Sequence, residues 1–344
     1  MKLVVAPDSF KECLDAAAVA AILSDEVSRI RPDAEVIYCP LSDGGEGFCE
    51  IVTAVLGGEI LHHMVTGPLG VPVKSSFGRV GDTAVIDAAS ACGLQMVPVP
   101  ERNPLVTTSR GLGELLLAAY GCGCTRVLVG VGGTATCDGG EGMMSVPGLK
   151  ELRGKISVEI LADVDTPFLG PRGAVAVFAP QKGATPGMME SLEERMRDCS
   201  QKILEETGKD VSDYPGAGAG GGIAGALMAY LDGSLRSGAD ALLEMLHFED
   251  IVRGADCIIT GEGKSDSQTL SGKVPQKVLE HSGGVPVILL SGKIEEREAL
   301  LEAGFHQLVQ VTPDCIPMEE ALKAEVTERN LREAVRTVLA SLFG

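Results

Sequence analysis

Three segments of the chain combine several glycines with acidic side chains. They are Asp43-Gly44-Gly45-Glu46-Gly47, the stretch from Gly132 to Gly140, and the stretch from Gly261 to Asp266. Glycine lets backbone N–H groups approach a phosphate, and a neighbouring carboxylate can hold the Mg²⁺ that accompanies nucleotide phosphates. One such segment is weak evidence, but three in one chain favour a protein that binds a phosphorylated nucleotide from several sides. The pattern indicates a phosphotransferase.

The familiar nucleotide motifs are incomplete in this chain. Gly263-Lys264-Ser265 matches the end of a P-loop, but Ile258 occupies the position of the first glycine, so a Walker cradle is not expected. Two stretches, 130–135 and 216–221, satisfy the pattern G-x-G-x-x-G/A. The first lies far from the N-terminal βα unit and the second follows no expected strand, so tight turns with close helix packing explain them equally well.

Composition excludes several classes of partner. The 344 residues include 29 Lys and Arg against 48 Asp and Glu, which gives a net charge of −19. This charge repels nucleic acids and anionic membrane surfaces, so neither is expected as a partner. Cysteines and histidines show no metal-ligand spacing, and neither a signal peptide nor a long apolar run is evident. We therefore expect a cytoplasmic protein and leave its oligomeric state open, a homo-oligomer included.

Both ends of the chain alternate between strand and helix patterns. Strands are expected at 3–6, 35–39, 257–260, 286–290 and 307–311. Helices are expected at 15–30, 46–56, 275–281, 295–302 and 318–342. Such alternation predicts a parallel sheet with helices on both faces.

The middle of the chain has a different pattern. Strand-like segments at 60–66, 71–80 and 83–86 are separated by Gly/Pro turns. Further strands are expected at 126–131, 158–162 and 175–178, with helices at 109–120, 186–206 and 222–231. We therefore predict an α/β protein of two domains, with residues 1–62 and 236–344 forming one domain and residues 63–235 an inserted mixed α/β domain.

Motifs along almost the whole chain resemble those of the glycerate kinase family, of the type that phosphorylates the 2-hydroxyl. They occur in the family's order: Ala6-Pro7-Asp8-Ser9-Phe10-Lys11, Leu41 to Gly47, Thr107-Thr108-Ser109 with Gly111 and Gly113-Glu114-Leu115, Gly132 to Gly140, Asp163-Val164-Asp165, Gln181 to Ala184, Pro215 to Gly218, Thr260 to Thr269, and Gly272-Lys273. The resemblance implies an ATP- and Mg²⁺-dependent kinase that converts D-glycerate to 2-phosphoglycerate. It also implies a flavodoxin-like first domain, with the active site in a cleft beside the inserted domain.

The chain departs from the family pattern at four places. Glu12 stands where the family usually has glycine, Cys137 where it has asparagine, and Thr166-Pro167-Phe168 where it has Asn-Pro-Leu. The segment from Gly142 to Ser157 is also shorter than the family's usual excursion at this point. If that excursion helps to cover the substrates, closure and substrate choice are the properties most affected.

Phosphoryl transfer requires positioning, charge neutralisation and a proton acceptor, and the candidates divide accordingly. The catalytic candidates are Asp43, which we favour as general base, with Asp138, Asp266 and Lys11. The nucleotide-binding candidates are Gly132, Gly133, Thr134, Gly139, Gly140, Lys182, Gly216, Gly218, Gly261, Glu262 and Gly263. The substrate-binding candidates are Asp8, Ser9, Lys11, Ser109 and Lys273. Asp163 and Asp165 are the Mg²⁺ candidates, because i, i+2 spacing at a strand end puts both carboxylates on one face.

Three other functions fit some of these features. A kinase of another small hydroxy acid would use the same loops. A dinucleotide-dependent oxidoreductase would account for the two G-x-G-x-x-G/A matches. A non-catalytic nucleotide sensor would agree with the shortened segment after Gly142.

Overall fold

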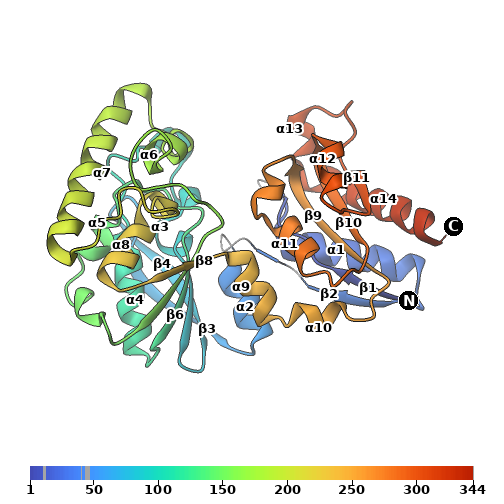
Figure 1. Cartoon of the computed structure of the whole chain (residues 1–344), viewed down its shortest axis with the longest axis horizontal. Coiled ribbons are helices and arrows are strands. Elements are labelled where there is room, and N and C mark those ends of the chain that lie inside the picture. The colour runs from blue at the N-terminus through green and yellow to red at the C-terminus, as the bar shows by residue number, and fades with distance from the viewer. Residues whose placement is uncertain (11–12, 40, 43–46, 344) are drawn as a thin grey trace. The chain divides into compact units, whose positions relative to one another are not determined.

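The computed structural model describes residues 1–10, 13–39, 41–42 and 47–343. The chain divides into two compact units, one formed by Met1–Asp43 with Ala239–Gly344 and the other by Gly44–Gly238 (Figure 1). Among the described residues, no helix has both the length and the apolar character needed to cross a membrane.

The first unit contains a five-stranded sheet built from both ends of the chain. Its strands are β1 (Lys2–Val5), β2 (Glu35–Tyr38), β9 (Cys257–Ser265), β10 (Val287–Ile294) and β11 (Gln307–Gln310). They lie in the order β11-β10-β9-β1-β2, and every neighbouring pair is parallel. This is the flavodoxin-like order, so the predicted fold class is confirmed, and its switch point lies between β1 and β9.

Helices cover both faces of this sheet. Its helices are α1 (Ala16–Ile30), α9 (Gly238–Met245), α10 (Phe248–Val252), α11 (Val274–Glu280), α12 (Arg297–Glu302), α13 (Met318–Ala321) and α14 (Ala324–Phe343). One core joins apolar side chains of α1 and α14 to alternate residues of β1, β9 and β10. The fully buried Glu26 on α1 links the two helices, because it accepts hydrogen bonds from Arg336 Nε at 2.7 Å and Arg332 Nη1 at 3.2 Å.

The second unit contains a six-stranded mixed sheet in the order β3-β4-β5-β6-β7-β8. The strands are β3 (Glu59–Thr66), β4 (Pro72–Val80), β5 (Thr83–Asp87), β6 (Arg126–Gly130), β7 (Ser157–Leu161) and β8 (Ser234–Arg236). The β3–β4 and β4–β5 pairs are antiparallel, and the remaining pairs are parallel. The carboxyl ends of β5 to β8 therefore meet at one edge of the sheet, where open α/β sheets bind their ligands.

The helices of the second unit pack around one large apolar core. They are α2 (Phe48–Val55), α3 (Ala89–Cys92), α4 (Arg110–Gly121), α5 (Glu141–Met144), α6 (Ala174–Phe178), α7 (Pro186–Thr207) and α8 (Ile223–Tyr230). Short 3₁₀ turns occur in both units: η1 (Leu94–Met96), η2 (Val99–Glu101), η3 (Lys150–Leu152), η4 (Pro180–Lys182), η5 (Ala219–Gly221) and η6 (Thr269–Ser271).

Three features of the fold differ from the sequence predictions. The predicted strand at 175–178 is the helix α6, whose buried residues Ala174 and Val175 contribute to the large core, so tertiary packing overrides the strand preference of valine. The strand β8 and the helices α9 and α10 were not predicted from the sequence. The first division between the units falls at Asp43 and Gly44 rather than near residue 62, because α2 packs against β4 and β5 of the second sheet.

Candidate functional site

The loop from Val131 to Gly140 follows β6 at the carboxyl edge of the second sheet. Gly133 is exposed with a φ of +67°, and Gly132 is half buried. The rest of the loop is buried, including the side chain of Thr134. The exposed backbone at Gly132 and Gly133 is therefore the part of this loop that can present N–H groups to a phosphate.

The glycines later in this loop contact a second glycine-rich segment. A Cβ on Gly221 would lie 2.0 Å from the carbonyl oxygen of Thr136, and one on Gly140 would lie 2.5 Å from Cβ of Ala226. Gly139 donates its own N–H to the carbonyl oxygen of Gly221 at 3.0 Å. These glycines permit close packing of protein against protein, which is the explanation that the sequence left open beside phosphate binding.

Gly216 and Gly218 are packed in the same way. A Cβ on Gly216 would lie 2.2 Å from a methyl carbon of Leu235, and one on Gly218 would lie 2.2 Å from the carbonyl oxygen of Pro167. Neither position could accept a larger residue without displacing its neighbours. Close packing therefore explains these two nucleotide-binding candidates without a ligand.

Asp138 is the single carboxylate of the loop and accepts four hydrogen bonds. It is 0% exposed, and its Oδ2 accepts bonds from Ser109 N and Ser109 Oγ, both at 2.8 Å, and from Gly142 N at 3.2 Å. Its Oδ1 accepts a bond from Gly140 N at 3.1 Å. Ser109 Oγ in turn accepts from Met143 N at 2.9 Å. This network ties the start of α4 to the start of α5, so Asp138 and Ser109 meet each other inside the protein.

Lys182 lies beneath the same loop. It is 4% exposed, and its Nζ donates hydrogen bonds to the carbonyl oxygen of Thr136 at 2.6 Å and to Thr134 Oγ1 at 3.2 Å. Burial lowers the pKa of this amine, and nearby Cys137, Cys92 and Asp138 oppose the effect. The ammonium therefore supports the loop from its inner side and places a positive charge behind Thr134.

Asp163 and Asp165 follow β7 at the same edge. The strand ends at Leu161 and Asp163 forms a bend, so the alternation that would put both carboxylates on one face no longer applies. Asp163 Oδ1 accepts a hydrogen bond from Gly238 N at 3.1 Å, and Asp165 is exposed. Among the described residues, no group of three or more His, Cys, Asp or Glu side chains is placed to hold a metal ion. Mg²⁺ commonly takes one or two carboxylates with waters and substrate phosphates, and an exposed carboxylate such as Asp165 fits that demand.

In the first unit, Gly261, Glu262 and Gly263 lie within β9 rather than in a loop. They are paired with β10, where Leu290 is opposite Gly261 and Ser291 is opposite Glu262. The strand predicted at 257–260 therefore extends to Ser265, and the glycine-rich segment that starts at Gly261 is not a loop. Glycine serves close strand contact here, because a Cβ on Gly261 would lie 2.5 Å from the carbonyl oxygen of Leu290.

The carboxyl ends of β1 and β9 bring several polar residues together. Asp8 is buried, its N–H donates to the carbonyl oxygen of Gly261 at 2.9 Å, and its Oδ1 accepts from Ser9 N at 2.7 Å. Glu262 is also buried, and its Oε2 lies 3.5 Å from the Nζ of Lys273. Asp8, Ser9, Glu262 and Lys273 therefore lie in the region of the flavodoxin-like switch point.

Asp266 has a more exposed setting. Its Oδ1 accepts a hydrogen bond from Gln268 N at 3.0 Å, and its Oδ2 lies 3.3 Å from Lys264 Nζ. These contacts stabilise the turn after β9. Lys11 and Asp43, the remaining catalytic candidates, lie outside the described residues.

Asp87 is a buried acid at the carboxyl edge of the second sheet, and the sequence analysis did not select it. It ends β5 and accepts hydrogen bonds from Gly47 N at 3.1 Å and Cys49 N at 3.0 Å, at the start of α2. It therefore anchors the helix that follows the first acidic glycine segment. Its position directly after the apolar strand at 83–86 was the available signal.

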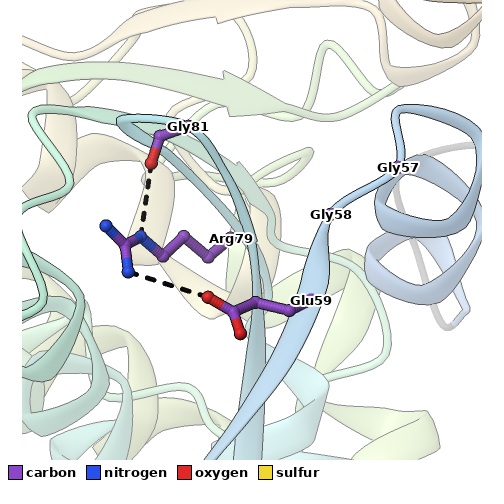
Figure 2. Close-up of a pocket in the computed structure, with 5 residues that line it drawn as sticks. All are labelled: Gly57, Gly58, Glu59, Arg79 and Gly81. Carbon is purple, nitrogen blue, oxygen red and sulfur yellow. Dashed lines mark hydrogen bonds and ion pairs between the residues drawn. The ribbon is translucent and has the colours of Figure 1, made fainter.

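A surface hollow of about 410 Å³ lies elsewhere on the second unit (Figure 2). Gly57, Gly58, Glu59, Arg79 and Gly81 line it. Arg79 spans the hollow, with its Nε donating to the carbonyl oxygen of Gly81 at 3.3 Å and its Nη1 lying 3.7 Å from Glu59 Oε1. The hollow adjoins the pairing of Val80 with Thr83, at the amino end of β5, so it is at the opposite sheet edge from the glycine-rich loops.

Comparison with known proteins identifies relatives along the whole chain. The family model described as the glycerate kinase family matches residues 3–154 and 145–343. A glycerate kinase of Bacillus subtilis is 39% identical, with 98% of each chain covered. A glycerate 2-kinase of Escherichia coli is 36% identical, covering 99% of this chain and 98% of the relative. A crystal structure of a putative glycerate kinase 2 from Salmonella typhimurium has a TM-score of 0.81 and 37% identity, covering 99% and 98%. The two segments of the family match meet at 145–154, within the segment that the sequence analysis found to be short.

Proposed function

The chain belongs to the glycerate kinase family and is an ATP-dependent kinase, and we propose that it transfers the γ-phosphate of ATP to the 2-hydroxyl of D-glycerate. The product would be 2-phosphoglycerate. The relative that is named a glycerate 2-kinase supports this choice of hydroxyl.

The nucleotide phosphates bind at the exposed backbone of Gly132 and Gly133. Backbone N–H groups there can donate to phosphate oxygens, and the glycines leave room for the phosphate to approach. Lys182 acts from behind, because its hydrogen bonds to Thr134 and Thr136 hold the loop and its charge favours an anion on the outer side. Gly139, Gly140, Gly216 and Gly218 contribute by allowing the supporting segments to pack closely.

Asp165, with Asp163, is the candidate to hold Mg²⁺. The exposed Asp165 carboxylate has the oxygen chemistry that this ion prefers, and Asp163 accepts a hydrogen bond from Gly238 N. When bound, Mg²⁺ would neutralise phosphate charge.

Asp43 remains our choice of general base. Asp138 already accepts four hydrogen bonds and is fully buried, so its carboxylate has no exposed face for a substrate hydroxyl. Asp266 is engaged with Lys264 and with the turn after β9. We assign Asp138 and Ser109 to holding the loop in shape, and Asp8, Ser9, Lys11 and Lys273 to the acceptor and its charge.

The match to the family model from residue 3 to residue 343 is the observation that carries this proposal. Its test is ADP release in a coupled assay with D-glycerate, L-glycerate, lactate and tartrate as separate acceptors. We expect D-glycerate to give the highest kcat/KM. Faster turnover of another hydroxy acid would reassign the substrate, and absence of ADP release with every acceptor would refute the kinase reaction.

A further inference from the structure

Glu262 is a buried acid in the middle of a polar network. It is 5% exposed, and its Oε1 accepts hydrogen bonds from Ser265 Oγ at 2.8 Å and Thr269 Oγ1 at 2.5 Å. Both hydroxyl-bearing residues are fully buried. A buried carboxylate needs such partners, and these two hydrogen bonds fix the orientation of the Glu262 carboxylate. The other oxygen, Oε2, is directed toward Lys273 at 3.5 Å.

Lys273 carries the exposed end of this network. It precedes α11, and its side chain is 37% exposed. Its separation of 3.5 Å from Glu262 is that of an ion pair and exceeds the usual N–H···O length. Among the described residues, Glu262 is its one charged partner, so the ammonium keeps N–H donors for an anion from solution.

Lys264, which lies on β9 with Glu262, has different charged partners from those of Lys273. Its Nζ lies 3.0 Å from Glu295 Oε2 and 3.3 Å from Asp266 Oδ2, and the hydrogen bond to Glu295 raises its pKa. Two carboxylates therefore balance its charge at the surface. Lys273 instead has a single buried partner behind it, which leaves its outer side open to a ligand.

We propose that Glu262 is a positioning residue that orients the Lys273 ammonium to bind the carboxylate of the acceptor acid. This inference rests on the proposed function for the identity of the acceptor. The buried carboxylate does not reach the substrates itself. It restricts where the Lys273 amine can lie, so less side-chain conformational entropy is lost when the acceptor binds.

Steady-state kinetics on the whole protein test the proposal with E262Q, K273M and the double variant. Gln is isosteric with Glu and its amide oxygen can still accept from Ser265 and Thr269, so the buried network is retained while its charge is lost. We expect E262Q and K273M each to raise KM for D-glycerate about tenfold with little change in KM for ATP, since the first weakens and the second removes the charged contact to the acceptor carboxylate.

The double variant should resemble K273M, because Glu262 acts only through the amine. The control is E295Q, which removes the exposed carboxylate beside Lys264 and should leave KM unchanged. Circular dichroism would verify that each variant is folded. Multiplying effects in the double variant would overturn the proposal, as would a rise in KM for ATP instead of D-glycerate.

A second measurement separates this proposal from the assignment of the substrate. Wild type and E262Q are treated with acetyl N-hydroxysuccinimide, and mass spectrometry follows acetylation of Lys273 and Lys264. Loss of the Glu262 carboxylate should release the Lys273 amine from its ion pair and raise the Lys273 acetylation rate about threefold or more, with the Lys264 rate unchanged. An unchanged Lys273 rate would refute the coupling of the two side chains. A changed rate in a protein that does not phosphorylate D-glycerate would support the coupling and refute the proposed acceptor.

Discussion

Asp138→Asn separates a structural role of this acid from a chemical one. The carboxylate accepts three hydrogen bonds at Oδ2, two from Ser109 and one from Gly142, and one bond from Gly140 at Oδ1. An asparagine amide has a single oxygen. The best orientation keeps that oxygen on the side of the three donors and turns the NH₂ group toward Gly140 N, which then faces a donor instead of an acceptor.

The expected loss of stability follows from this count. Leaving one buried N–H unsatisfied costs about 1 to 3 kcal/mol, and converting three charge-assisted hydrogen bonds to neutral ones weakens them further. We therefore expect the variant to lose about 3 kcal/mol of unfolding free energy, which corresponds to a fall of about 1 M in the urea midpoint for a slope near 3 kcal/mol per M.

Urea unfolding followed by circular dichroism measures this change. Asp266→Asn is the matched control, because Asp266 accepts one N–H bond that asparagine can keep and otherwise pairs with the exposed Lys264. The control should lose less than about 1 kcal/mol. An Asp138→Asn protein with an unchanged midpoint and a turnover reduced a hundredfold would refute the structural role and restore Asp138 as a candidate base.

Three further substitutions test other parts of the account. Gly221→Ala should lower the free energy of unfolding by more than about 3 kcal/mol, because its Cβ would lie 2.0 Å from the carbonyl oxygen of Thr136. The control Gly208→Ala has a similar φ of +73° and nothing within 4 Å, so it should lose about 1 to 2 kcal/mol, and equal urea midpoints for the two variants would contradict this reasoning. Burial lowers the pKa of Lys182 in the folded protein, so between that lowered pKa and 10.5 the unfolded state binds more protons than the folded state. The stability of wild type relative to Lys182→Met should therefore increase as pH rises through this range, and a difference in urea midpoint that does not depend on pH would refute this prediction. Asp43→Asn should reduce turnover about a hundredfold with an unchanged circular dichroism spectrum, and normal turnover would remove Asp43 from the role of base.

The sequence predicted the sheet of the first unit well because each of its strands contains a short apolar run. The run at 257–260 identified β9, but not its continuation to Ser265. Gly261 to Ser265 alternate small and charged residues, and they are extended because β10 pairs with them. Gly292 permits that pairing, since a Cβ there would lie 2.4 Å from the carbonyl oxygen of Gly263. The partner strand was predicted at 286–290, but the register that extends its pairing to Ser265 cannot be inferred from local composition.

The surroundings of the candidate residues could not be predicted from the sequence. Asp138 and Ser109 were both selected, but as a catalytic acid and a substrate ligand, and the hydrogen bonds that join them span 29 positions of the chain. The glycines at 139, 140, 216 and 218 were selected for phosphate contact, although close packing explains each of them. Composition shows that a backbone must approach something closely. Tertiary structure is needed to show whether that neighbour is protein or ligand.

The position of the transferred phosphate tests the central claim most directly. The protein would be incubated with ATP, Mg²⁺ and D-glycerate, and ³¹P and ¹³C NMR of the product would identify the phosphorylated carbon. We predict 2-phosphoglycerate, with ADP formed in equal amount. Phosphate on the 3-hydroxyl, or ATP consumption without a phosphorylated glycerate, would contradict the account.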